Sequence, residues 1–244
     1  SPKISDIILM GSERIHLFDT PLLMSRNMGL AVDQRVAKRI MDILVSGIGI
    51  VITSPIMLLI AIAVKAYDRG PVFYFQDRLT IGGKPFKICK FRSMCVDSEK
   101  NGARLASKHD SRITPVGHVL RNLHLDELPQ LFNILKGDMS VVGPRPERPE
   151  LTEQYKKEMP EFEFRLKVKA GLTGYAQVTG VYDTSPYDKL KMDLMYIENY
   201  SARMDLQIIL MTLKTMLFPG KTNAETEEGV LPCEHQTDKE ENDR

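Results

Sequence analysis

The sequence predicts an α+β fold that is mostly helical and associated with a membrane, and three observations indicate this. Residues 43–64 contain no charged residue. Two short apolar segments are separated by Gly82-Gly83, a turn signal typical of a β-hairpin. Residues 187–200 and 205–218 repeat apolar side chains at helical spacing, as amphipathic helices do. The chain has 244 residues, of which 43% are apolar, so it is long and apolar enough to form a core.

The uncharged run at 43–64 is long enough to cross a bilayer of roughly 30 Å as a helix that rises about 1.5 Å per residue. Ser54 and Pro55 lie at its midpoint, where a proline removes a backbone hydrogen bond and bends a helix. The Ser54 hydroxyl can satisfy a carbonyl group freed in this way. One interpretation is a re-entrant helix that breaks at Ser54-Pro55 and dips into one leaflet. A kinked transmembrane span and a buried core helix are the alternatives.

Basic residues lie on both sides of the apolar run. They are Arg35, Lys38 and Arg39 before it, and Lys65, Arg69, Lys84, Lys87 and Lys90 after it. The positive-inside rule then places both ends at the cytoplasmic face, which favours the re-entrant interpretation.

Charge and cysteine content narrow the function classes. Residues 219–244 hold eight acidic and three basic residues, so this tail is acidic while the rest of the chain is basic. A basic body suits a membrane surface or an anionic substrate, and such a tail is typical of disorder. No nucleic-acid-binding motif is present in the sequence, which disfavours that class. Cys89, Cys95 and Cys233 have neither metal nor disulfide spacing, so we expect a reducing, cytoplasmic setting.

Two adjacent carboxylates, Asp126 and Glu127, point most clearly to chemistry. Pro129 follows them, and proline is tolerated in a helix only in its first turn. A helix is therefore predicted to begin near Leu128 and to end at Gly137. Carboxylates at a helix N-terminus stay ionised, can bind a hard divalent cation, and can supply a nucleophile. The alternative is an acidic N-cap with no further role.

Arg145 lies between Pro144 and Pro146. Because proline fixes φ on both sides, the guanidinium is carried on a stiff loop and suits a phosphate or carboxylate ligand. Carboxylates that suit a metal and an arginine that suits a phosphate, about twenty residues apart, indicate phosphoryl transfer. A salt bridge that fixes a turn is the alternative.

Further basic residues are candidates to contact an anionic substrate. They are Lys90 and Arg92 at the end of the second predicted strand, and Arg112 and Arg121 upstream of the acidic pair. Lys90 and Arg92 alternate with apolar residues, so a solvated strand face is the alternative. Arginines near carboxylates form either a salt-bridge scaffold or a diphosphate clamp.

The remaining elements are predicted from turn signals and spacing. They are strands at 72–75 and 85–91, a polar loop or short helix at 97–109, a charged, solvated helix at 150–167, and a strand with a turn at 168–180. The helix at 205–218 has one apolar side, which lies either in the core or on the bilayer interface.

Several segments form an ordered set between residues 32 and 218. They are Lys38-Arg39-x-x-Asp42, Ser54-Pro55, Gly70-Pro-Val-Phe, Lys90-Phe-Arg-Ser-Met, Arg112-x-Thr-x-x-Gly117-x-x-Leu120-Arg121, Leu125-Asp-Glu-Leu-Pro-Gln-Leu, Lys136-Gly-Asp-Met-Ser-Val-Val-Gly-Pro-Arg-Pro and Gly171-Leu-Thr-Gly-Tyr-Ala-Gln-Val. Together they resemble the bacterial sugar transferases, also called polyprenyl-phosphate hexose-1-phosphate transferases or monotopic phosphoglycosyl transferases. The match is specific because no single motif carries it.

The resemblance implies the domain organisation. Residues 32–218 would be the catalytic domain of a long-form member, monotopic on the cytoplasmic face of a bacterial membrane, with 43–64 as its re-entrant helix and with interfacial amphipathic helices. Residues 1–31 would be the joint to an upstream region, and 219–244 a disordered tail. The oligomeric state is left open, and a homodimer is one possibility.

The resemblance also implies a reaction. Asp126 would attack the β-phosphate of a UDP-sugar and displace UMP, leaving a phosphosugar on the enzyme. The phosphate of a polyprenyl phosphate, such as undecaprenyl phosphate, would then take over that group and begin exopolysaccharide or capsule synthesis. Glu127, together with Asp126, would hold Mg²⁺. The sequence does not identify the sugar. A non-catalytic membrane adaptor with a basic lipid-binding surface is the alternative function.

Overall fold

The computed structural model describes Ile4 and residues 12–17, 20–25, 29–96, 110–180 and 185–217. The predictions for residues 97–109 and 219–244 lie outside this part of the chain. The α-helices are α2 (Val32–Asp68), α3 (Pro115–Asn122), α4 (Gln130–Lys136), α5 (Pro149–Glu158), α6 (Tyr175–Thr179), α7 (Pro186–Glu198) and α8 (Ala202–Leu217). The strands are β1 (Ser12–Leu17), β2 (Thr20–Ser25), β3 (Phe73–Leu79), β4 (Pro85–Phe91), β5 (Ser140–Val142) and β6 (Gly171–Thr173). Within the described residues, the 3₁₀ helices are η1 (Ile81–Gly83), η2 (Leu125–Glu127) and η3 (Pro160–Lys167).

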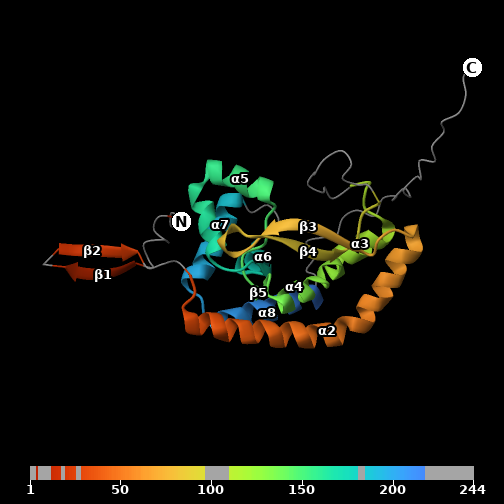
Figure 1. Cartoon of the computed structure of the whole chain (residues 1–244), viewed down its shortest axis with the longest axis horizontal. Helices are drawn as coiled ribbons and strands as arrows, with labels where there is room; N and C mark the ends of the chain where they lie inside the picture. Colours follow the sequence, from red (N-terminus) through yellow and green to blue (C-terminus); the bar gives the residue numbers. More distant parts are fainter. Residues whose placement is uncertain are drawn as a thin grey trace, which may run out of the picture.

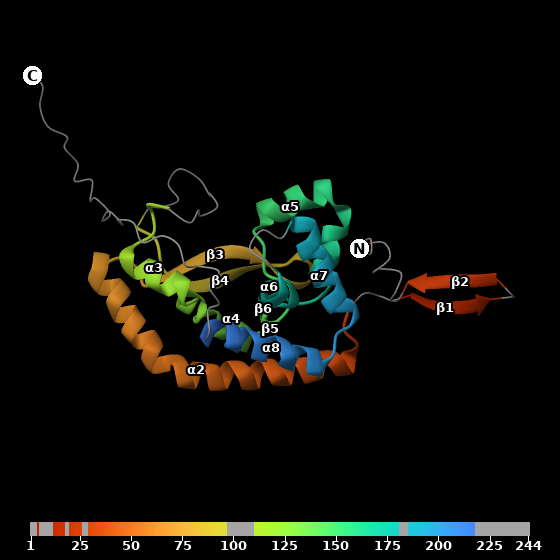
Figure 2. The ribbon, with the colours of Figure 1, turned by 180° about the vertical axis from the view of Figure 1, so that it is seen from behind.

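The helix α2 forms one side of the molecule and bends around it (Figures 1 and 2). It is long and apolar enough to cross a membrane, and only 17% of its most apolar window is buried against the protein. The prediction of an apolar helix over residues 43–64 is therefore confirmed, and the alternative of a buried core helix is wrong.

The predicted break at Ser54-Pro55 is not a gap in the helix, because α2 continues through Pro55. Pro55 has no N–H to donate to the carbonyl group of Val51, four residues earlier. The Ser54 hydroxyl donates to that carbonyl oxygen instead, at 2.9 Å. The predicted role of Ser54 is thus confirmed, and it explains how the helix continues past a proline.

Both halves of α2 are attached to the same folded body. Near its start, Lys38 donates to Asp205 of α8 at 2.6 Å, and Asp42 accepts from the amide of Val141 at 2.8 Å. Near its end, Asp68 forms an ion pair with Arg92. The neighbouring Arg39 donates to two carbonyl groups of α4. Lys38 and Arg39 therefore both have partners inside the protein. These two basic residues before the apolar run thus hold α2 to α8 and α4.

The predicted hairpin is confirmed. β3 and β4 pair antiparallel, with Phe73 opposite Phe91 and Leu79 opposite Pro85. Gly82 and Gly83 connect them with φ values of 68° and 70°, a left-handed conformation that glycine adopts without strain.

The parallel pair of β5 and β6 depends on glycines at its end. The backbone of Gly143 approaches Gly171 and Gly174 so closely that a Cβ atom on Gly171 would lie 2.1 Å from the Gly143 nitrogen. A Cβ on Gly174 would lie 2.2 Å from the Gly143 oxygen. Gly171 and Gly174 therefore permit a close approach of the two backbone segments that a side chain at either position would prevent.

Two predicted elements need correction. The charged helix expected over 150–167 is divided at Met159 into α5 and η3, because Pro160 cannot continue the hydrogen bonding of α5. The strand and turn expected over 168–180 is the short strand β6 followed by the helix α6. Residues 1–30, which gave no clear pattern, contain the antiparallel pair β1–β2.

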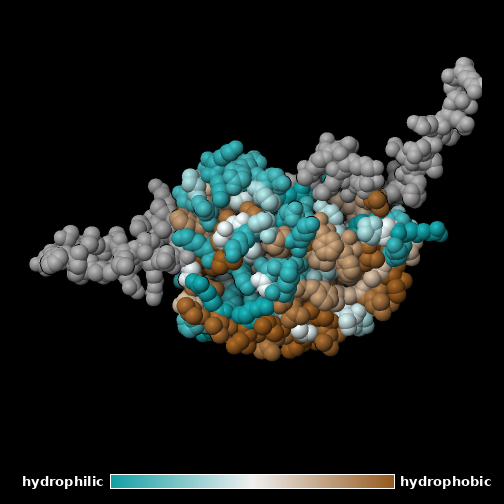
Figure 3. Space-filling model, viewed as in Figure 1, coloured by the Kyte–Doolittle hydropathy of each residue, from teal (hydrophilic) through white to brown (hydrophobic). Residues whose placement is uncertain are grey.

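The helices expected at 187–200 and 205–218 are confirmed as α7 and α8. α8 buries Asp205 and Ile208, whereas Leu206, Leu210 and Leu213 are exposed. α8 therefore contributes Ile208 to the core, with Met204 and Ile209 packed against it, and leaves the rest of its apolar side exposed. A band of hydrophobic surface lies along the side of the molecule formed by α2 (Figure 3). The exposed apolar residues of α2 include Val36, Ile40, Leu44, Ile48, Val51, Ile52, Leu58, Leu59 and Ile62.

Candidate active site

The two adjacent acids lie where the sequence places them, directly before α4. His124 has a left-handed φ of 55° and starts the single turn η2, which carries Asp126 and Glu127. Pro129 follows at the N-cap of α4, and Gly137 ends that helix with φ of 103°. The predicted start near Leu128 is confirmed to within two residues.

The carboxylate of Glu127 binds two cationic side chains. Its Oε1 atom accepts from Lys90 Nζ at 2.6 Å and from Arg145 Nη2 at 3.0 Å. No side-chain cap is formed at the N-cap of η2 or of α4. The acidic N-cap alternative is therefore wrong. The hairpin, the turn before α4 and the Pro-Arg-Pro loop meet at this carboxylate.

The two neighbouring carboxyl groups differ in their electrostatic surroundings. Burial alone would raise the pKa of Glu127, but Arg145 and Lys90 outweigh it and hold the pKa at about 2. Burial raises the pKa of Asp126, and the neighbouring charge of Glu127 raises it further. Lys90, Arg121 and His124 oppose that rise. Glu127 is thus firmly ionised, while Asp126, which is 9% exposed, is the more basic group.

Of the five basic residues predicted to bind substrate, Lys90 and Arg145 contact the acidic pair directly. Arg121 acts on Asp126 through its charge and donates to the Ser93 hydroxyl at 3.0 Å. Arg145 keeps 49% of its side chain exposed. A guanidinium that is both anchored and accessible is suited to an anionic ligand.

Arg92 and Arg112 form ion pairs with aspartates other than Asp126. Arg92 is buried and pairs with Asp68 at the end of α2. Gly70 makes room for it, since a Cβ there would lie 2.3 Å from Arg92 Nη1. Arg112 pairs with Asp110 at 2.6 Å and lowers the pKa of that carboxyl to about 2. Their substrate contacts stay predictions.

The acidic pair has the donor atoms that a divalent cation requires. Mg²⁺ is commonly bound by one or two carboxylates together with substrate phosphates and water. Asp126 and Glu127 supply two adjacent carboxylates in a largely buried position. Among the described residues, no group of three or more His, Cys, Asp or Glu side chains forms a protein-only metal site. The residues therefore fit a hard cation shared with a phosphate ligand.

Sequence reasoning missed two arginines that contact the Pro-Arg-Pro loop. Arg165 Nη2 donates to the Arg145 carbonyl at 3.1 Å, and Arg78 Nη1 donates to the Pro146 carbonyl at 3.1 Å. The charged segment 150–167 predicts a solvated position for Arg165, but the residue is buried. Phe162 and Phe164, which precede it in an otherwise charged segment, are the signal that this segment contacts the core.

Comparison with known proteins gives a consistent result. Residues 33–219 match the family described as bacterial sugar transferase. The chain is 45% identical over 183 residues to a UDP-N-acetylgalactosamine-undecaprenyl-phosphate N-acetylgalactosaminephosphotransferase of Aeromonas hydrophila, covering 74% of this chain and 43% of that protein. It is 44% identical over 204 residues to a UDP-glucose:undecaprenyl-phosphate glucose-1-phosphate transferase of Klebsiella pneumoniae, covering 82% of this chain and 42% of that protein.

A shorter relative matches along more of its own length. A UDP-glucose:undecaprenyl-phosphate glucose-1-phosphate transferase of Caulobacter vibrioides is 37% identical over 193 residues, covering 77% of this chain and 72% of that protein. The chain thus spans less than half of the two longer relatives and most of this one. The names of these relatives differ in the sugar.

Proposed function

The chain belongs to the bacterial sugar transferase family, and on this premise we propose that it transfers a sugar 1-phosphate from a UDP-sugar to a polyprenyl phosphate. The product would be a lipid-linked diphosphosugar that begins a surface polysaccharide. The observation that carries this proposal is the convergence of Lys90 and Arg145 on Glu127, next to the buried Asp126. Two adjacent carboxylates, one of which binds two cationic side chains, suit phosphoryl transfer better than membrane adhesion alone, because the exposed cation Arg145 can also contact a phosphate.

In the proposed first step, a carboxylate oxygen of Asp126 attacks the β-phosphorus of the UDP-sugar. The bond from that phosphorus to the bridging oxygen breaks, and UMP leaves with the electron pair. Asp126 suits the nucleophile because burial and Glu127 make it the more basic of the two acids. Arg145 and Arg121 would bind the phosphate oxygens and the charge that develops on them.

In the proposed second step, a phosphate oxygen of the polyprenyl phosphate attacks the same phosphorus, and the Asp126 carboxylate leaves. Mg²⁺, held by Asp126 and Glu127, would neutralise the diphosphate. Lys90 and Arg145 keep Glu127 ionised, as a ligand for such a cation requires. The enzyme returns to its starting state, so the two substrates use one site in turn.

The exposed apolar surface of α2 and α8 would bind the membrane and so hold the site beside it. Exposed apolar side chains cover α2, and α8 exposes Leu206, Leu210 and Leu213. Both halves of α2 are bound to the same body, which supports a re-entrant helix in one leaflet over a span with ends on opposite sides. A monotopic position on the cytoplasmic face would bring the site to the level of the lipid phosphate.

The test is the purified, detergent-solubilised protein with Mg²⁺, undecaprenyl phosphate and each of several UDP-sugars. We expect UMP and a lipid-linked diphosphosugar to form in equal amounts with one sugar, and both to disappear when EDTA removes the metal. Absence of both products with all sugars would contradict the transferase and favour a membrane adaptor.

A further inference from the structure

The loop that carries Arg145 is held along its main chain. Four consecutive carbonyl groups, those of Pro144 to Glu147, each accept a hydrogen bond. The donors, in that order, are Gly171 N at 2.9 Å, Arg165 Nη2 at 3.1 Å, Arg78 Nη1 at 3.1 Å and Leu79 N at 3.1 Å. Prolines at 144 and 146 already restrict φ. The main chain on both sides of Arg145 is therefore fixed, although its guanidinium is half exposed.

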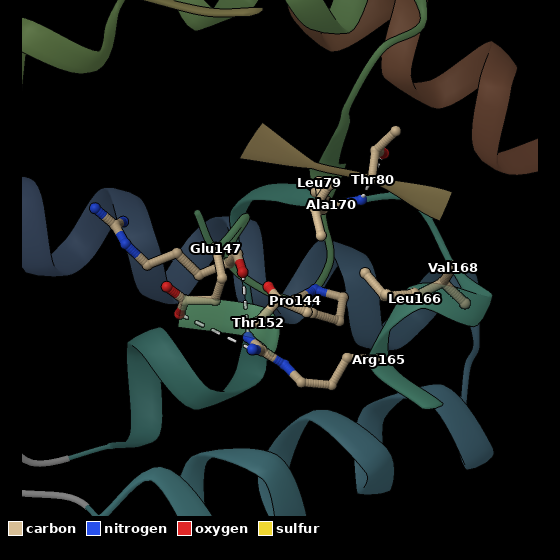
Figure 4. Close-up of a pocket in the computed structure, with 10 residues that line it drawn as sticks. Leu79, Thr80, Pro144, Glu147, Thr152, Arg165, Leu166, Val168 and Ala170 are labelled. Carbon is tan, nitrogen blue, oxygen red and sulfur yellow. Dashed lines mark hydrogen bonds and ion pairs between the residues drawn. The ribbon is translucent and has the colours of Figure 1, made fainter. Parts of the chain in front are cut away.

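Arg165 is itself fixed by a buried set of contacts. Its Nε donates to Asp193 Oδ2 at 2.7 Å, and both side chains are almost fully buried. Its guanidinium carbon lies 4.6 Å from the centre of the Phe162 ring. The remaining nitrogens reach the Arg145 carbonyl and, at 3.9 Å, the Glu147 carboxylate (Figure 4). The planar fork thus serves three partners at once.

Arg78 supports the next carbonyl from the hairpin. Its Nη2 donates to Gln76 at 2.6 Å while its Nη1 holds the Pro146 carbonyl. Burial lowers the pKa of Arg78, Glu147 opposes this, and the like charge of Arg145 adds to it. Arg78 therefore lies beside Arg145 and Arg148 with Glu147 as the opposing negative charge, and it donates to the loop carbonyl from this position.

The space beside the loop does not form a ligand site. A cavity of about 20 Å³ lies between Pro144, Glu147, Arg165 and Val168, lined also by Thr80 and Leu166 (Figure 4). This volume holds roughly one water molecule. This cavity is therefore too small to hold a substrate.

We infer that Arg165 and Arg78 are positioning residues, which hold the main chain of the Pro144–Glu147 loop so that the Arg145 guanidinium stays at Glu127. This inference rests on the proposed function, because the task of Arg145 is to bind phosphate next to the acidic pair. Arg165 contributes the larger part, since it binds the carbonyl group of Arg145 itself.

The test is a double-mutant cycle on the full chain. Lysine at position 165 keeps the charge beside Asp193 but cannot reach the Arg145 carbonyl at the same time. We expect R165K to lower kcat roughly tenfold to hundredfold, as for the loss of a hydrogen bond from a charged donor. In the R145A background we expect R165K to cause no further loss, because its effect passes through Arg145. R203K, an Arg-to-Lys change at an exposed position of α8, is the matched control and should equal the wild type.

Two results would overturn the inference. One is an R165K protein as active as the wild type, and the other is a double variant whose loss equals the product of the single losses. If R165K does not fold, R78K takes its place in the same cycle. Hydrogen exchange of the peptide spanning residues 143–148 separates this inference from the proposed function. If the wild-type protein transfers no sugar, the proposed function is wrong. Hydrogen exchange then still tests the positioning role: an exchange rate of the 143–148 peptide that is the same in R165K and in the wild type would exclude it.

Discussion

At the scale of single residues, Asp126 and Glu127 are neighbours in the chain with different surroundings. Glu127 shares one oxygen between Lys90 and Arg145, and its pKa is held at about 2. Asp126 has its pKa raised by burial. Two carboxyl groups whose pKa values are pushed apart are typical of groups with separate chemical roles. The sequence predicted where both acids lie, but not which cations would contact Glu127, since Lys90 is 37 residues away.

Because Asp126 and Glu127 have different proposed roles, substituting each of them should impair a different part of the reaction. D126N should abolish transfer, because an amide cannot act as the nucleophile. E127Q should keep a residual rate and raise the Mg²⁺ concentration needed for half-maximal activity. UMP release, measured against Mg²⁺ concentration, checks both. Wild-type activity in D126N would show that another group is the nucleophile, and an unchanged Mg²⁺ requirement in E127Q would remove Glu127 from the metal site.

At the scale of elements, local signals predicted some segments and long-range contacts decided others. Gly82-Gly83 predicted the hairpin, and Pro129 with Gly137 predicted α4, because turn and cap residues act within a few positions. Pro160 is a local signal for the division of 150–167, because proline cannot continue the hydrogen bonding of a helix. The parallel pair β5–β6 had none, because each strand has three residues and its partner lies about thirty residues away.

The close approach of β5 and β6 predicts a steric effect at one glycine. In G171A the new Cβ would meet the Gly143 backbone at 2.1 Å, and backbone atoms cannot move aside cheaply. We expect a loss of about 1–3 kcal/mol or more in the free energy of unfolding. Thermal unfolding in detergent measures it.

Gly47 provides the matched control for that substitution. A Cβ there meets no atom within 4 Å, and alanine favours a helix over glycine by about 1 kcal/mol. G47A should therefore be as stable as the wild type or slightly more stable. An equal melting temperature for G171A and the wild type would show that the β5–β6 contact is looser than the structure has it.

At the scale of the whole molecule, one polar body is bordered by an apolar surface along α2 and α8. The sequence predicted the apolar run and both amphipathic helices. It left open whether the apolar side of 205–218 is core or interface, since helical spacing is the same in both cases. The structure shows both: Ile208 lies in the core with Ile209 packed against it, whereas Leu206, Leu210 and Leu213 are exposed.

This surface predicts how the protein leaves a membrane. An inserted helix is held by apolar contact, which salt does not screen, whereas a basic surface on anionic lipid is released as ionic strength rises. We expect the protein to stay in the membrane pellet in 1 M salt, where the Debye length is about 3 Å, and to be released by detergent. Release by salt alone would contradict insertion of α2.

In the proposed mechanism, Asp126 carries the phosphosugar between two substrates. We would first incubate the purified protein with Mg²⁺ and a UDP-sugar, without lipid, and measure the mass of the peptide that contains Asp126 by mass spectrometry. We predict a mass increase of one phosphosugar, lost when polyprenyl phosphate is added and absent from D126N. Product formation in the presence of lipid, with no adduct in its absence for any sugar, would contradict the claim and indicate direct transfer between the two bound substrates.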